Sequence, residues 1–243
     1  MACAGGTRVV RAGPVATREN HAAGHEPDLN GCKLSNSQGI VPALTMRRHQ
    51  TLNNRTRTGP WTVVAKRTTY DNSWIRVAHH DVITPAGIPG IYGTVHFKNL
   101  ATGVVPVDEH GFTYLVGQHR FPLDRYSWET PQGGGALDLD PLQSAARELR
   151  EETGLVARQW RELMQADLSN SITDERTVVF LAWDLTSGAV SPDPTEQLVV
   201  RRLPLTEAFE MVAGGRIRDA TSIMSLQAVK LLHLEGRLPT ACA

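Results

Sequence analysis

Three things are scarce in this chain: cysteine, net charge and long apolar runs. The three cysteines, Cys3, Cys32 and Cys242, lie near the ends of the 243 residues and have no spacing typical of metal ligands. An odd, scattered set argues against a disulfide framework and is typical of a reducing compartment. No apolar run approaches the roughly 20 residues that a membrane-spanning helix needs. We therefore expect a soluble, cytoplasmic protein without a membrane partner.

The charges cancel, with 25 Lys and Arg residues against 25 Asp and Glu residues. No overall positive field is then available to attract the phosphates of a nucleic acid. This balance disfavours a nucleic-acid partner.

Residues 1–58 differ in composition from the rest of the chain. They are rich in Gly, Ala, Asn, Arg and His, and they carry few aliphatic residues at helical or strand spacing. No apolar stretch of a secretory signal follows the first arginines. We expect a disordered tail over residues 1–58 and one folded domain over residues 59–243.

Beyond Gly59, β-branched and aromatic residues recur in short runs between turn-forming residues, a pattern that predicts strands. The expected strands cover residues 61–70, 74–83, 91–97, 101–108, 112–121, 156–168 and 175–185. Helical spacing predicts two closing helices over residues 205–212 and 220–234. This order of elements predicts an α+β fold.

The segment from Pro131 to Leu155 predicts a further helix with clear ends. Asp140 suits the N-cap, Pro141 the first helical position and Gly154 the left-handed residue that ends a helix. Apolar residues gather on one face of this helix, so it is expected to bury that side.

A different face of the same helix carries Glu148, Glu151 and Glu152 at positions i, i+3 and i+4. Like charges at this spacing repel by roughly 0.2–0.5 kcal/mol per pair, and a divalent cation would offset that cost. The alternative is a solvated acidic face balanced by neighbouring arginines. A glycine loop over residues 133–135 favours the cation, because glycine lets the backbone approach a phosphate or a metal closely.

The segment resembles the Nudix box, G-x5-E-x7-R-E-U-x-E-E-x-G-U, in which U is aliphatic. The matching residues are Gly133, Arg147, Glu148, Leu149, Glu151, Glu152, Gly154 and Leu155. Leu139 departs from the pattern, because the box has a glutamate there that usually supports the box arginine. The resemblance implies a Nudix α/β/α sandwich with a mixed β-sheet. It also implies a site for Mg²⁺, with Mn²⁺ possible, whose ligands are Glu148, Glu151, Glu152 and the Gln132 carbonyl.

Flanking segments resemble ADP-ribose pyrophosphatases and related nucleotide-sugar hydrolases. WETPQGG is similar to their E-x-P-x-G-G motif, which makes Glu129, Gly133 and Gly134 substrate-binding candidates. GQHRFP is similar to their G-Q-x-R strand end, which implies that Arg120 binds substrate phosphates through bidentate contacts. The alternative for Arg120 is a surface ion pair with Asp124.

A later segment, LSNSITDERTVVFLA, resembles the loop in which this subfamily carries a catalytic acid. Glu175 is the best match for that acid, with Asp174 as an alternate. The implied catalytic residues are thus Glu175, Glu152 and Arg147.

The resemblance implies hydrolysis of the pyrophosphate bond of a nucleoside-diphosphate derivative, with ADP-ribose giving AMP and ribose 5-phosphate. Two alternatives stay open: another nucleotide-sugar or dinucleotide substrate, and a Nudix-like binding module that has lost catalysis. Leu139 is the sequence feature that favours the second. A homodimer is implied by analogy alone, because N-terminal strands of two subunits help form the adenine pocket in the resembled subfamily.

Overall fold

The computed structural model describes residues 55–188, 198–239 and 242. Most of the tail expected over residues 1–58 lies outside these described residues. Its last three residues do not fit that expectation, because Thr56–Thr58 form strand β1, which pairs antiparallel with β2. The folded chain therefore begins slightly before the expected boundary.

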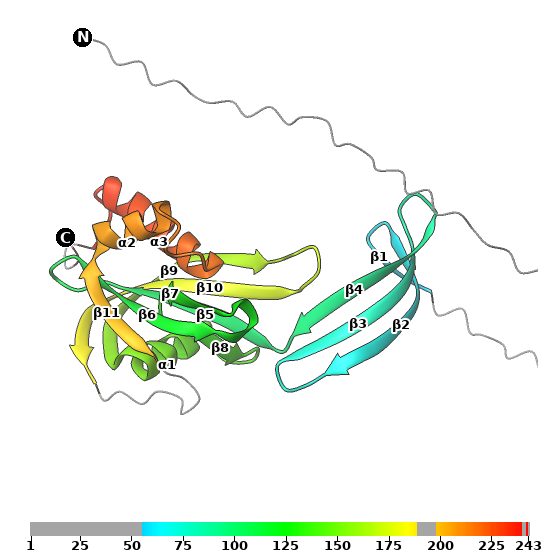
Figure 1. Cartoon of the computed structure of the whole chain (residues 1–243), viewed down its shortest axis with the longest axis horizontal. Coiled ribbons are helices and arrows are strands. Elements are labelled where there is room, and N and C mark those ends of the chain that lie inside the picture. The colour runs from blue at the N-terminus through cyan, green and yellow to red at the C-terminus, as the bar shows by residue number, and fades with distance from the viewer. Residues whose placement is uncertain (1–54, 189–197, 240–241, 243) are drawn as a thin grey trace, which may run out of the picture. The chain divides into compact units, whose positions relative to one another are not determined.

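Three β-sheets and three α-helices make up the described residues (Figure 1). The strands are β1 Thr56–Thr58, β2 Trp61–Asp71, β3 Ile75–Ile83, β4 Pro89–Phe97, β5 Asn99–Pro106, β6 Phe112–Arg120, β7 Arg125–Glu129, β8 Gln132–Ala136, β9 Leu155–Leu168, β10 Glu175–Ser187 and β11 Val199–Pro204. The helices are α1 Pro141–Thr153, α2 Leu205–Ala213 and α3 Ala220–Leu234, and a 3-10 turn covers Phe121–Leu123. All the strands and helices expected from spacing are present. No helix among these residues is long and apolar enough to cross a membrane.

The first sheet is an antiparallel meander in the order β1-β2-β3-β4. Its last strand, β4, leads into β5 of the next sheet with only Lys98 between them. The second sheet has the order β8-β5-β10-β9, in which β5 and β10 are parallel and the other pairs are antiparallel. The third sheet, β11-β6-β7, is antiparallel.

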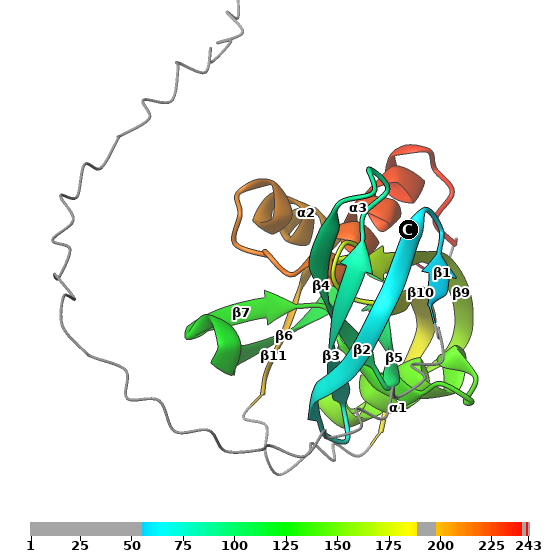
Figure 2. The same ribbon diagram turned by 90° about the vertical axis from the view of Figure 1, so that its right-hand side faces the viewer.

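Helices cover both faces of the second and third sheets, and both views place α1 on the opposite side from α2 and α3 (Figures 1 and 2). Alternate strand residues serve the two layers, as the two-residue period of a strand requires. Val104 and Phe180 pack in the cluster that contains α1, whereas their neighbours Val105 and Leu181 pack in the cluster that contains α2 and α3. This confirms the expected α/β/α sandwich with a mixed sheet.

Strand β8 corrects the expectation of a glycine loop, because Gly133, Gly134 and Gly135 pair with β5 in an antiparallel ladder. Glycine is a poor strand former, so the residues alone favoured a loop. Packing explains their place in a strand. A Cβ atom at Gly133 would lie 2.2 Å from the Glu148 carboxyl carbon, and one at Gly135 would lie 2.0 Å from the Ser144 hydroxyl. A side chain at Gly135 would collide with Ser144 of α1, and one at Gly133 would displace the Glu148 carboxylate.

We predict that Leu149→Ala lowers the free energy of unfolding by about 2–5 kcal/mol, because its side chain is fully buried between α1 and the sheet. Chemical denaturation monitored by circular dichroism measures this change. Leu231→Ala is the matched control, since Leu231 is 59% exposed on α3, and a change within about 0.5 kcal/mol is expected there. Equal losses from the two variants would contradict the packing described for α1.

Candidate active site

Helix α1 begins and ends where its sequence predicts. The Asp140 side chain accepts a hydrogen bond of 3.0 Å from the Leu142 N–H, and Pro141 occupies the first position. Gly154 has a φ of 72° and closes the helix by donating its N–H to the Arg150 carbonyl at 2.9 Å. These caps set the helical register, and the register determines which side chains face β8.

The three box glutamates lie along the junction of α1 with β8. Glu152 is 5% exposed, and its carboxylate accepts a hydrogen bond of 2.9 Å from the Gln132 N–H. Glu148 has a side chain only 13% exposed and packs against the Cα of Gly133, while Glu151 is 31% exposed. The structure thus brings together the residues proposed from the sequence as metal ligands.

Arg147 holds two of these glutamates. Its guanidinium donates to Glu151 at 2.7 Å, to Glu148 at 2.6 Å and to the Gly134 carbonyl at 2.8 Å. Burial opposes its charge, but the two carboxylates outweigh burial and raise the pKa of Arg147. Leu139, in place of the box glutamate, is 50% exposed. Support of the box arginine therefore comes from α1 and β8 in this chain.

Arg120 and Glu129 form an ion pair that the sequence did not predict. The Arg120 Nε donates to Glu129 Oε1 at 2.9 Å, its Nη2 donates to Oε2, and Gln132 Nε2 donates to the same Oε2 at 2.8 Å. Glu129 is only 3% exposed. Burial would raise its pKa, but Arg120 outweighs burial and holds the pKa of Glu129 below its usual value. The alternative pairing of Arg120 with Asp124 is wrong, since Asp124 lies beside His119 instead.

Gln132 links the box glutamates to the Arg120–Glu129 pair, because it donates to both Glu152 and Glu129. We call this group of residues the acid cluster, and electrostatics connect Asp219 and Glu175 to it. Burial, and then the negative charge of Asp219, raise the pKa of Glu175. The pKa of Arg120 is raised first by its hydrogen bonds to Glu129 and also by the charges of Asp219 and Glu152. The charges of Glu152 and Asp219 therefore act on Arg120, and Glu175 is linked to this group through Asp219.

Asp219 was not predicted from the sequence as a site residue. It is the N-cap of α3, where its carboxylate accepts hydrogen bonds of 2.8 Å from the Ser222 N–H and from the Ser222 hydroxyl. That hydroxyl also accepts a hydrogen bond of 2.9 Å from the Thr130 N–H. An Asp directly before a helical stretch is a recognisable cap signal, but its position beside Glu175 depends on packing.

The two candidates for the catalytic acid, Asp174 and Glu175, interact with different residues. Asp174 accepts a hydrogen bond of 2.8 Å from the Phe97 N–H and pairs with His96, so its carboxylate is engaged with β4. Glu175, the first residue of β10, lies instead near Asp219. The hydrogen bonds therefore show that Asp174 fastens the turn to β4, whereas Glu175 is the candidate on which the charge of Asp219 acts.

The donor set fits a hard divalent cation. In the described part of the chain, no three His, Cys, Asp or Glu side chains stand in a metal-holding arrangement. Glu148 and Glu151 are both paired with Arg147, whose side chain is 42% exposed. Carboxylate oxygens are the ligands that Mg²⁺ prefers. The side-chain oxygen of Gln132 is also buried and accepts no hydrogen bond from the described residues, as expected of a site that a cation and its waters complete.

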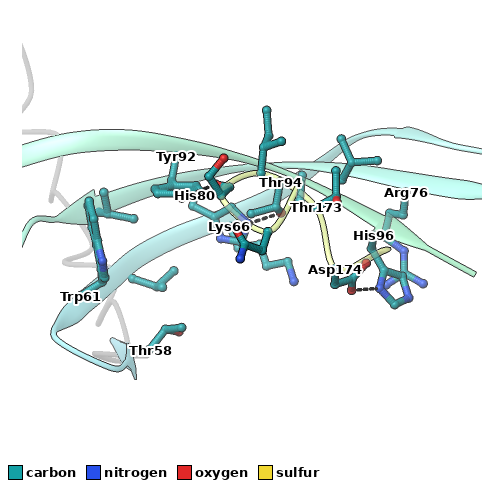
Figure 3. Close-up of a pocket in the computed structure, with 17 residues that line it drawn as sticks. Thr58, Trp61, Lys66, Arg76, His80, Tyr92, Thr94, His96, Thr173 and Asp174 are labelled. Atoms are coloured by element: carbon teal, nitrogen blue, oxygen red, sulfur yellow. Dashed lines mark hydrogen bonds and ion pairs between the residues drawn. The ribbon is translucent and has the colours of Figure 1, made fainter. Parts of the chain in front are cut away.

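A cavity of about 560 Å³ lies elsewhere, between the first sheet and residues 170–174 (Figure 3). Trp61, Lys66, His80 and Tyr92 are among its lining residues, and none of the box glutamates is. This cavity is therefore separate from the box glutamates.

Comparisons with known proteins match two regions of the chain to family models. The NUDIX domain matches residues 98–225, and the nucleoside diphosphate sugar hydrolase N-terminal domain matches residues 61–95. The second region corresponds closely to the first sheet.

Similar proteins include two bacterial enzymes and one solved structure. The CMP-5'-(N-acetyl-N-hydroxy-3-aminopropyl)phosphonate hydrolase of Streptomyces rubellomurinus is 32% identical over 70% of this chain and 82% of its own. The ADP-ribose pyrophosphatase of Bacillus subtilis is 29% identical over 69% of this chain and 91% of its own. A crystal structure of an ADP compounds hydrolase is similar in fold, with a TM-score of 0.67 and 20% identity over 75% of this chain and all of that chain.

The NUDIX model spans the box helix, both candidate acids and the start of α3. It covers more than half of the chain, and the box residues it includes stand together in the structure. The chain therefore belongs to the Nudix family and is a Nudix pyrophosphohydrolase.

Proposed function

We propose that the protein hydrolyses ADP-ribose at its pyrophosphate bond, releasing AMP and ribose 5-phosphate, with Mg²⁺ as its metal. The observation that carries this proposal is the acid cluster, in which the box glutamates lie beside a buried arginine–glutamate pair. Relatives named ADP-ribose pyrophosphatase in Bacillus subtilis and Mycobacterium tuberculosis support the choice of substrate. Nudix hydrolases generally use a divalent metal ion, which supports the choice of cofactor class.

Glu148, Glu151, Glu152 and the Gln132 carbonyl would hold the metal. When bound, the ion would neutralise the diphosphate and lower the pKa of a coordinated water. Arg147 would leave Glu148 and Glu151 as the ion binds, and its bond to the Gly134 carbonyl would keep the guanidinium beside β8.

Arg120 would bind the substrate diphosphate. A guanidinium has five N–H donors, and Glu129 engages only two of its nitrogens. Glu129 therefore orients the fork and leaves donors for phosphate oxygens. Gly133 and Gly134 would let the backbone approach the same phosphates, since neither carries a side chain.

Glu175 would act as the general base. A water oxygen attacks one phosphorus, the bridging P–O bond breaks, and the proton of the water passes to the Glu175 carboxylate. Its raised pKa suits this task, because a base whose pKa lies nearer to neutrality takes a proton more readily.

A substrate panel tests the proposal directly: ADP-ribose, GDP-mannose, NADH, a diadenosine polyphosphate and a CMP-linked phosphonate, each with Mg²⁺, Mn²⁺ or a chelator. The last compound is included because of the Streptomyces relative, and GDP-mannose because of a GDP-mannose pyrophosphatase in Yersinia enterocolitica that is 33% identical over half of this chain. We expect metal-dependent cleavage, fastest for ADP-ribose, with AMP and ribose 5-phosphate as products. Preference for another compound would reassign the substrate. No turnover of any compound would favour a binding module.

We predict that Glu152→Gln lowers kcat at least about 100-fold, because the amide loses the charge that a metal ligand needs, a contribution of several kcal/mol. The amide oxygen can still accept from the Gln132 N–H, so the thermal unfolding temperature should change little. Glu210→Gln, on the exposed side of α2, is the matched control and should leave kcat unchanged. A folded Glu152→Gln protein with normal turnover would refute the metal assignment.

We predict that Asp219→Asn shifts the acid limb of the pH profile of kcat/KM to lower pH. Glu175 must be ionised to act as a base, so activity falls as pH drops through its raised pKa. Removing the Asp219 charge lowers that pKa, and asparagine preserves the α3 cap. Asp184→Asn, at the far end of β10, is the control and should leave the acid limb in place. The metal ion is kept at a saturating concentration at each pH. An acid limb that stays in place would show that Asp219 does not act on the base.

A further inference from the structure

The residues directly before Glu175 are fastened to strand β4 of the first sheet. The Val95 N–H donates to the Ile172 carbonyl at 2.9 Å, and the Asp174 N–H donates to the Val95 carbonyl at 3.3 Å. Val95 and Thr173 thereby form a parallel β-bridge. The Tyr92 hydroxyl adds a bond to the Ser171 carbonyl. The turn that precedes the proposed base is therefore part of the edge of the first sheet.

Hydrogen bonds within the turn also hold it together. The Thr173 hydroxyl donates to the Leu168 carbonyl at 2.6 Å, and the Ile172 N–H donates to the Ser169 carbonyl at 3.0 Å. Ser169 has a φ of 48°, which is uncommon for a residue with a side chain. These contacts make residues 169–174 a compact unit, and a shift at its β4 contact would be passed on to Glu175.

The parallel ladder between β4 and this turn changes at Asp174. In a continued ladder, the Phe97 N–H would donate to the Asp174 backbone carbonyl, two residues beyond the bond made by Val95. It donates instead to the Asp174 side chain, at 2.8 Å. His96 pairs with the other carboxylate oxygen, as the dashed line in Figure 3 shows. The carboxylate thus replaces a backbone acceptor, a substitution that short polar side chains make readily.

This replacement lets the backbone leave β4 at Glu175. From there the chain pairs with β9, in the register Glu175 with Leu168, and rejoins a parallel ladder only at Thr177 with Ala101 of β5. Between the two parallel stretches, the Asp174 side chain ties the turn to residues 96 and 97. Glu175 is the first residue after this tie, and the charge of Asp219 acts on it.

We propose that Asp174 is a positioning residue, whose carboxylate takes the ladder bond from Phe97 and thereby aims Glu175 at the acid cluster. The proposal rests on the proposed role of Glu175 as the general base. It also links the first sheet to catalysis, because the atoms that hold Asp174 belong to β4.

A double-mutant cycle tests the proposal on the full chain, with ADP-ribose as substrate and saturating Mg²⁺. We expect Asp174→Ala to lower kcat about 10–100-fold with a smaller change in KM, because a misplacement of about 1 Å costs on the order of 100-fold. In the Glu175→Gln background, the same substitution should change kcat less than about twofold, since the position of an absent base has no effect. Hydrogen exchange should also show faster exchange of the Phe97 amide in Asp174→Ala.

Conservative variants separate geometry from charge. Asp174→Asn keeps an acceptor for the Phe97 N–H and should recover most of kcat, whereas Asp174→Glu keeps the charge but lengthens the side chain and should not. If Asp174→Ala fails to fold, comparing kcat of Asp174→Asn with kcat of Asp174→Glu still tests the positioning role. Asp71→Ala is the matched control, because Asp71 pairs with Lys98 and Arg76 beside the same link between sheets, away from the turn. It should leave kcat unchanged.

The outcomes distinguish two failures. Normal turnover by Glu175→Gln would refute the base assignment and the positioning role together. An impaired Glu175→Gln variant in which Asp174→Ala still multiplies the loss would overturn the positioning role alone. Normal kcat in Asp174→Ala, or rescue by glutamate rather than asparagine, would overturn it as well.

Discussion

The close approach of helix α1 to strand β8 is the constraint on which the rest of the site depends. Gly133 and Gly135 leave no room for a side chain between them and α1, where Glu148 and Ser144 stand. The Gln132 N–H then reaches Glu152 at 2.9 Å. A helix held this near presents its carboxylates to the strand that leads in from Glu129, so the residues proposed as metal ligands and the arginine proposed to bind substrate share one region. A side chain at Gly135 would push against Ser144 of α1, and one at Gly133 would displace the Glu148 carboxylate.

Charge balance follows from that packing. The approach gathers several carboxylates at low exposure, and uncompensated burial of such charges is costly. Arg147 lies over Glu148 and Glu151, and Arg120 forms a two-bond fork with the buried Glu129. Glu175 has no such cationic partner among the causes that shift its pKa, and burial and Asp219 raise that pKa. Arg120 thus outweighs burial and lowers the pKa of Glu129, whereas the pKa of Glu175, the residue proposed as the proton acceptor, is raised.

Sequence reasoning found the elements with strong local patterns. Strands with alternating β-branched residues and the capped helix α1 lie where spacing placed them, because these signals act over a few residues. It missed β1, β7, β8 and β11, which are short or rich in glycine or charge, and whose strand form depends on neighbours. The glycines of β8 were wrongly assigned to a loop for this reason. These glycines pair with β5, and their lack of side chains leaves space for side chains of α1.

The sequence by itself determined the family, the box helix and the face that carries Glu148, Glu151 and Glu152, because helical geometry converts spacing directly into direction. Only the tertiary structure decided that Asp174 is held by Phe97, 77 residues earlier in the chain, and is thereby engaged with β4. It also decided that Arg120 pairs with Glu129 and that Asp219 lies near Glu175. These contacts join separate strands and a distant helix cap, and no local spacing specifies them; packing of the layers does.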